Sequence, residues 1–80
     1  MAASHDAARM AFERVWAMGW PFHARRRLQG VRLEATDVDV AVGDGPAVTG
    51  RAADLLLLMT GRTAAALPRL TGPGIGLLPA

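Results

Sequence analysis

The sequence contains no cysteine, no tyrosine and no lysine among its 80 residues. Without cysteine, a disulfide framework and thiolate chemistry are excluded. All nine basic residues are arginines, and with seven acidic residues the formal net charge is only +2. A balance this close to neutral does not indicate nucleic-acid binding, although the arginines raise the isoelectric point.

Long apolar runs are also missing. The longest spans five residues, 55–59, whereas a membrane-spanning helix needs about 20. The first ten residues lack the charged start and apolar stretch of a secretory signal. We therefore expect a cytoplasmic protein without a membrane partner.

Aromatic residues are few and unevenly placed. The four present all precede residue 23: Phe12, Trp16, Trp20 and Phe22. A chain of this size buries only about 60–65% of its unfolded surface, so the aromatic residues of the N-terminal part are expected to serve an interface. We divide the chain into residues 1–21, a helix and linker, and residues 22–80, a small α+β domain.

The first element is a helix expected over residues 4–18. Ser4 can cap its first amides, and Gly19 is expected to end it in the left-handed conformation, just before Pro21. Apolar residues recur at steps of three and four and predict one buried stripe: Ala8, Ala11, Phe12, Val15 and Met18.

Two alternating patterns then predict strands. In residues 31–36 the apolar side chains occupy odd positions, and in residues 38–42 they occupy even ones. Because a one-residue slip moves every side chain to the other face, Thr36-Asp37 must form a bulge or a tight turn. A turn at residues 43–46 and a short strand at 47–49 follow.

Residues 52–60 predict a helix that is apolar on nearly all sides and therefore buried. Gly61 is expected to end it. Thr63 could cap a short helix over residues 64–67 that Pro68 ends, and residues 75–78 predict a last strand or a docking segment. The expected fold is α+β: an N-terminal helix, then a small antiparallel sheet of two to three strands packed on the buried leucine-rich helix.

Metal and nucleophile chemistry find little support. His5 and His23, the only histidines, have no ligand spacing with each other or with a carboxylate, so no metal site is expected. No serine or threonine lies in a nucleophile elbow. Residues 43–54 resemble a glycine-rich phosphate loop before a helix but match neither established pattern, and a turn explains their glycines equally well.

Charged residues offer three further candidates. Asp37 and Asp39 could work as a pair in acid–base chemistry, but acids at a turn more often accept hydrogen bonds from backbone amides. The arginines at 25–27 are expected to be solvated or paired with carboxylates, not bound to nucleic acid. Arg62 follows the leucine-rich helix, where it could clamp a carboxylate or complement the helix dipole.

Five segments taken in order carry a resemblance to a known family: WPF at 20–22, RRRL at 25–28, VRLEATDVD at 31–39, GDGPAVTGRAADLLLLMTGR at 43–62 and LTGPG at 70–74. Over residues 18–78 the chain resembles the C-terminal region of the mycothiol-dependent maleylpyruvate isomerase family. The resemblance implies a domain similar to the sterol carrier protein fold, packed against an N-terminal helical bundle.

In that family the bundle holds a divalent metal through histidine and glutamate, and mycothiol is the thiol cofactor. Family enzymes convert maleylpyruvate to fumarylpyruvate, and the C-terminal domain is thought to add an arginine to the cleft. Arg62 is the matching position. The metal-binding bundle is missing from this sequence, so this chain is expected to hold no cofactor, to be inactive alone and to need a partner bundle.

Two alternatives remain open. A sterol-carrier-like domain can bind an apolar ligand between sheet and helix, in a cavity that residues 55–59, Val31, Leu33, Val40 and Val42 would line. The chain could also form a homodimer through Trp16, Trp20 and Phe22, since aromatic residues commonly anchor interfaces.

Overall fold

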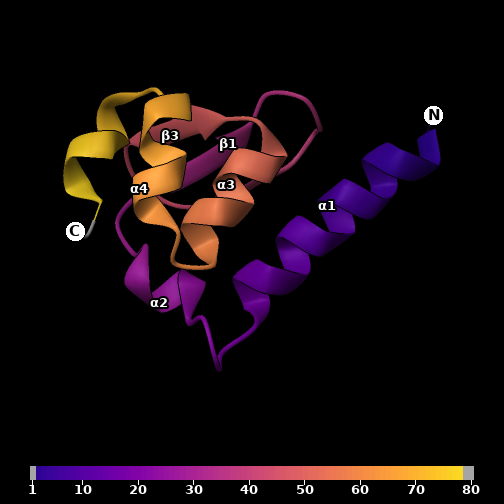
Figure 1. Cartoon of the computed structure of the whole chain (residues 1–80), viewed down its shortest axis with the longest axis horizontal. Helices are drawn as coiled ribbons and strands as arrows, with labels where there is room; N and C mark the ends of the chain where they lie inside the picture. The colour runs from indigo at the N-terminus through magenta and orange to yellow at the C-terminus, as the bar shows by residue number, and fades with distance from the viewer. Residues whose placement is uncertain (1, 79–80) are drawn as a thin grey trace.

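The computed structural model of the chain describes residues 2–78, with side chains from residue 7 onward. The elements are α1 (Ala2–Ala17), α2 (Ala24–Arg27), β1 (Arg32–Ala35), β2 (Ala41–Gly43), β3 (Ala47–Gly50), α3 (Ala52–Met59), α4 (Thr63–Ala66) and the short 3-10 helices η1 (Leu67–Arg69) and η2 (Pro73–Leu77). The expected α+β class is confirmed. Helices α3 and α4 cover one face of the sheet, while the N-terminal half of α1 projects away from it (Figure 1).

The sheet is mixed, with the strand order β2-β1-β3. Strand β1 pairs antiparallel with β2, where Arg32 faces Gly43, and parallel with β3, where Arg32 faces Ala47. The expected antiparallel pairing is therefore correct for β1 and β2 and wrong for β1 and β3. Residues 44–46 do not fold β3 back onto β2. They cross the start of β1, where the Arg32 amide donates to the Pro46 carbonyl at 3.0 Å.

The crossing requires glycine at position 45. Its φ is +131°, and a Cβ atom there would overlap with the carbonyl group of Gly30. Only a residue without a side chain lets the two backbone segments approach so closely. The crossing therefore places the end of β2 and the start of β1 side by side.

The alternation of apolar residues changes phase at a tight turn between β1 and β2, and not at a bulge. The Ala35 amide donates to the Val40 carbonyl at 3.1 Å, which closes a loop over residues 36–39. Val38 and Val40 are both buried although β2 begins only at Ala41. The loop thus carries apolar side chains back into the core before the second strand starts.

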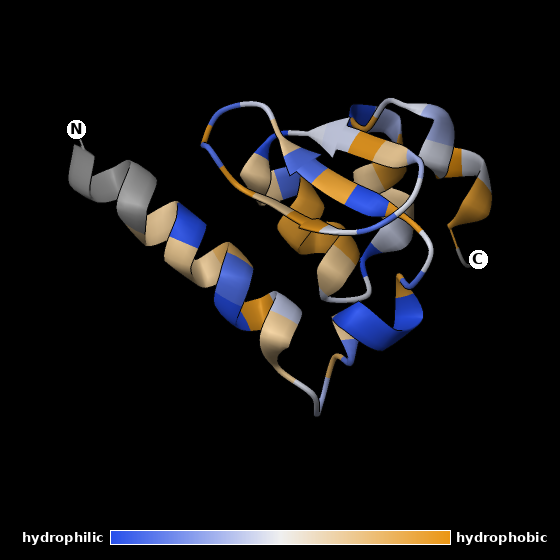
Figure 2. Cartoon of the chain, turned by 180° about the vertical axis from the view of Figure 1, so that it is seen from behind, coloured by the Kyte–Doolittle hydropathy of each residue, from blue (hydrophilic) through white to orange (hydrophobic). Residues whose placement is uncertain are grey.

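The core lies between the sheet and α3. Leu55, Leu58 and Met59 of α3 are at most 1% exposed and pack with Leu33 of β1 and Val48 of β3. Full burial of one such side chain stabilises the fold by about 2 kcal/mol. The predicted buried leucine-rich helix is confirmed. The opposite face of β1 carries the exposed Arg32–Glu34 ion pair at 2.8 Å and faces the viewer in Figure 2.

Helix α1 differs from its prediction at both ends. It already includes Ala2, the first described residue, so Ser4 lies within the helix and not at its N-cap position. The side chains of Ser4 and His5 lie outside the described residues. At the other end α1 stops at Ala17, and Gly19 is not left-handed; in this connection His23 takes that conformation, with φ 50°.

The predicted stripe of α1 is only partly buried. Phe12 is fully buried in the core cluster, and Ala8 and Val15 pack against that cluster, whereas Ala11 is exposed. The core thus includes Phe12, a residue of the segment 1–21 that the sequence assigns to a helix and linker outside the small α+β domain. Within the described residues, no helix combines the length and apolar character needed to cross a membrane.

The C-terminal part also departs from expectation. Thr63 is the first residue of α4 and not its cap. The α-helix α4 ends at Ala66, before Pro68, but a 3-10 helix, η1, continues through the proline. Pro68 is tolerated there because the first residues of a helix need no amide donor. Of the two expectations for residues 75–78, the strand is wrong and the docking segment is correct: most of these residues belong to η2, which packs against β3.

Candidate functional site

The C-terminal end of α3 holds Arg62 on a fixed backbone. Gly61 turns the chain with φ +90°. The Arg62 amide donates to the Leu57 carbonyl at 2.8 Å, and its carbonyl accepts from the Ala66 amide at 3.1 Å. The side chain is exposed, and its guanidinium makes no hydrogen bond or ion pair with any residue that the structure describes. Arg62 is therefore positioned by its backbone and open to a ligand or partner through its side chain.

Arg27, and not Arg62, complements the carbonyl end of α3. Its Nη2 donates to the Met59 carbonyl at 2.5 Å, and its Nε donates to the Phe22 carbonyl at 2.7 Å. A cation at this end satisfies an otherwise unpaired carbonyl and stabilises the helix dipole. The expected carboxylate pairing is wrong for Arg27, which donates to two backbone carbonyls instead. One of them, that of Met59, is 32 residues away in the sequence.

Sequence reasoning missed this role, although a signal was present. Ala24 and Leu28 are buried four residues apart on α2 and its end. Arg27 lies three residues after Ala24 and Arg25 three residues before Leu28, so the spacing indicates one arginine near this face without saying which of the two it is. Arg25 and Arg26 are exposed, as expected for a solvated pair; α2 is the strongly hydrophilic segment of Figure 2.

A hollow of about 450 Å³ opens beside the end of α3. Its lining residues are Pro21, Phe22, His23, Arg26, Arg27, Thr60 and Gly61. Arg62 follows this lining directly in the chain. Arg27 and Thr60 already donate to backbone carbonyls. The open guanidinium groups at this end of the molecule are those of Arg26 and Arg62, and such donors suit a carboxylate.

The acidic pair is split by the turn. The Asp37 carboxylate Oδ1 accepts a hydrogen bond from the Ala52 amide at 2.8 Å, while Asp39 is exposed. Asp37 therefore caps α3 from 15 residues away, which is the backbone role weighed against acid–base chemistry. The adjacent residue Arg51, at the N-cap position itself, makes no side-chain capping bond.

Replacing Asp37 by alanine is expected to lower the free energy of unfolding by about 1 kcal/mol, the usual loss on removing a capping oxygen. Urea unfolding followed by circular dichroism measures this change. Asp39→Ala is the matched control and is expected to change stability by less than about 0.5 kcal/mol, as at other exposed sites. Equal losses in the two variants would show that Asp37 does not act as a cap.

The same cap bears on the glycine-rich segment 43–54. Because the Asp37 carboxylate already occupies an amide at the start of α3, an anionic ligand there would meet a negative charge. Gly43 and Gly45 have φ of +84° and +131° and build the crossing over β1. The turn explanation of these glycines therefore fits the structure better than a phosphate loop.

The residues proposed for an apolar cavity pack against one another. Six of them belong to the buried core cluster, namely Leu55, Leu58, Met59, Val31, Leu33 and Val40, and the other three, Leu56, Leu57 and Val42, pack against it. The aromatic residues proposed for a dimer interface differ in exposure: Trp20 is 82% exposed, whereas Trp16 and Phe22 are half-buried.

Among the side chains from residue 7 to residue 78, no group of three or more histidine, cysteine or acidic residues is arranged to hold a metal ion. His23 is exposed at the start of α2. Comparisons of the chain with protein-family models, with curated proteins and with solved structures find no match.

Proposed function

We propose that this chain is a C-terminal-type domain of the mycothiol-dependent maleylpyruvate isomerase family. It would supply the Arg62 guanidinium to a thiol-dependent, metal-assisted site that a partner helical bundle completes, and it would be inactive alone. The observation that carries the proposal is that Arg27 and Arg62, both near the end of α3, have different roles. Arg27 serves the end of α3, so Arg62 is left free for a substrate.

Three features support a carboxylate as the group that Arg62 binds. The guanidinium is a planar donor whose geometry matches a carboxylate in two parallel hydrogen bonds. Its backbone is held on both sides, which limits the entropy lost on binding. The ordered motif set from residue 20 to residue 74 supplies the link to an isomerase that acts on a dicarboxylate.

The metal and mycothiol belong to the partner in this proposal, since the described side chains offer no metal-ligand cluster. This chain contributes binding and orientation of a carboxylate. We place it in the cytoplasm, in keeping with the absence of cysteine.

The test combines this chain with the isolated, metal-loaded bundle of a family enzyme and mycothiol. We expect the mixture to isomerise maleylpyruvate, followed by its ultraviolet absorbance, and each component alone to be inactive. Arg62→Ala should lower the rate of the mixture about a hundredfold, the usual loss when one positioned charge-stabilising donor is removed. Arg62→Lys should restore only part of it, because lysine lacks the planar fork.

Arg69→Ala is the matched control. Arg69 is 70% exposed and lies 4.0 Å from Asp54, and its loss should leave the rate unchanged. A chain that neither binds the bundle in calorimetry nor supports turnover would overturn the proposal. Sedimentation as a stable dimer in that case would favour the oligomerising alternative, with the exposed Trp20 at the interface.

A further inference from the structure

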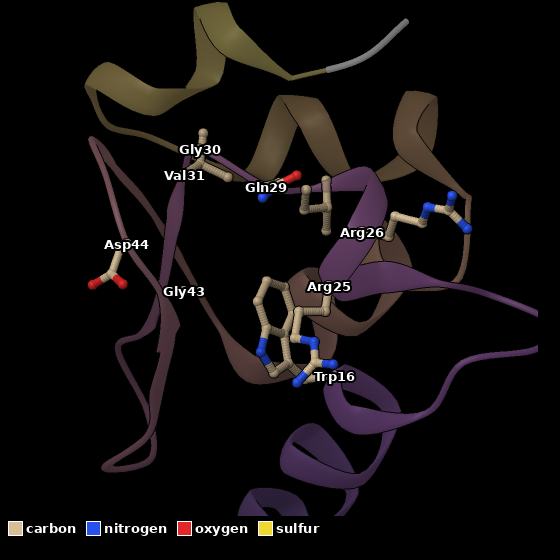
Figure 3. A pocket seen from close by; sticks show the side chains of 9 residues that line it. Trp16, Arg25, Arg26, Gln29, Gly30, Val31, Gly43 and Asp44 are labelled. Atoms are coloured by element: carbon tan, nitrogen blue, oxygen red, sulfur yellow. The ribbon is translucent and has the colours of Figure 1, made fainter.

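A second hollow, separate from Arg62, lies where the end of α1, α2 and the crossing over β1 meet (Figure 3). Its volume is about 610 Å³, within the range of about 300–1,000 Å³ typical of small-molecule sites. Leu28 and Val31 are buried beneath it. Trp16, Arg25, Gln29 and Asp44 contribute an aromatic ring and polar groups to its walls.

The Trp16 indole is held against the backbone of β2. A Cβ atom built on Gly43 would lie 3.4 Å from two carbon atoms of the indole six-membered ring. The ring therefore lies at van der Waals distance from position 43, where a side chain would overlap with the Val31 carbonyl oxygen. The result is a half-buried aromatic wall that can stack a flat ligand.

Charges of opposite sign lie on the two sides of this wall. Figure 3 shows the Arg25 side chain running beside the indole and Asp44 across the opening, while Arg26 points away from Trp16. Neither Arg25 nor Asp44 makes a hydrogen bond or ion pair with another side chain in the described part of the chain. Both are free to bind a ligand.

The fold fixes the acidic side. Asp44 lies in the segment 44–46, which is tied to β1 through the hydrogen bond between Arg32 and Pro46 and through the close approach of Gly45 to Gly30. The carboxylate therefore starts from a rigid backbone and not from a loose loop. Arg25 belongs to α2. This helix is held in place by the hydrogen bond from Arg27 to the Phe22 carbonyl and by the buried side chain of Leu28 that follows it.

We propose that this hollow binds a small planar carboxylate that carries a hydroxyl or amino group at its other end. The carboxylate accepts hydrogen bonds from the Arg25 guanidinium, the flat body stacks on Trp16, and the donor at the far end binds the Asp44 carboxylate. A phosphate ester such as a nucleotide fits less well, because its two or more negative charges would lie near the Asp44 carboxylate; Arg26 also lines the hollow but points away from Trp16. The inference does not rest on the proposed function, since Arg62 does not line this hollow.

The probe is 4-hydroxybenzoate, titrated into the ¹⁵N-labelled full chain. The two indole N–H signals are assigned with Trp20→Phe, which removes one of them. We expect a saturable shift of the Trp16 signal. Arg25→Ala should weaken binding about tenfold or more, as expected on losing a charge-assisted hydrogen bond. Arg51→Ala, which removes the same charge from an exposed position that does not line the hollow, should change it less than about twofold.

Asp44→Asn tests the other end of the ligand. In the unmodified chain, 4-hydroxybenzoate should bind more tightly than benzoate, which lacks the hydroxyl group, and Asp44→Asn should reduce that preference. Phenol, which lacks the carboxylate, should bind at least about tenfold more weakly than 4-hydroxybenzoate. The remaining amide signals of each variant report whether it is still folded.

Several outcomes would overturn the inference. The absence of a saturable Trp16 shift would exclude the site. Equal weakening by Arg25→Ala and Arg51→Ala would show a general charge effect and not a built site. Equal binding of phenol would show that the hollow selects apolar rings without reading the carboxylate.

Discussion

Replacing Gly45 by alanine is expected to unfold most of the chain or to leave it barely stable. The residue has φ +131°, and an added Cβ would overlap with the Gly30 carbonyl at the crossing over β1. Backbone strain of this kind costs about 1–3 kcal/mol, and steric overlap adds a similar amount. A domain of 80 residues has a total stability of about 4–12 kcal/mol, so the combined loss is a large part of it.

Gly61→Ala is the matched control for this prediction. Gly61 also has positive φ, +90°, but a Cβ there would meet nothing within 4 Å. Its loss should therefore be limited to strain, about 1–2 kcal/mol. Urea unfolding monitored by tryptophan fluorescence measures both variants. Similar midpoints for the two would mean that the crossing is not as tight as the structure indicates.

Truncating Phe12 to alanine is expected to lower the free energy of unfolding by about 3–5 kcal/mol, the usual cost of removing a buried phenylalanine. Phe12 is fully buried although it belongs to α1, whose N-terminal half projects from the body of the molecule. Thermal unfolding followed at 222 nm measures the loss. The expected size reflects both the lost apolar contact and the cavity left against the core cluster.

Met10→Ala on the same helix separates packing from helix propensity. Met10 is 65% exposed, and alanine is at least as good a helix former, so this change should alter stability by less than about 0.5 kcal/mol. If Phe12→Ala were equally mild, α1 would not be part of the folding unit, against the buried stripe that its sequence predicts. A large loss would place α1 within the folding unit.

Much of the local structure was predictable because it depends on neighbours in sequence. The leucine run produced α3, the alternation after Val31 produced β1, and the glycine and proline residues at 43–46 marked a turn. The break at Thr36-Asp37 followed from the change of apolar phase. Helix ends were predicted less well, as at Ser4 and Gly19, because a helix can extend or stop within one turn at small cost.

The functional candidates also divide into those that depend on neighbours in sequence and those that depend on contacts in the folded chain. The position of Arg62 after the leucine-rich helix could be read from sequence, since it needs only the helix end. That Arg27 takes the dipole role and leaves Arg62 exposed could not, because residues 27 and 59 meet only in the folded chain. The cap that Asp37 gives to α3 likewise joins residues 15 apart, with the strands β2 and β3 between them in the chain.

The sequence by itself determined which segments become helices, strands and turns, since side-chain periodicity and backbone preference act over a few residues. The tertiary structure alone decided that β3 pairs parallel with β1, because either direction buries the same valine, Val48, and only the path of residues 44–46 distinguishes them. That path also brings Asp44 opposite Arg25 and packs Trp16 on Gly43. A binding surface formed by residues that are far apart in the sequence depends on the distances between them in the fold, and no local sequence pattern encodes those distances.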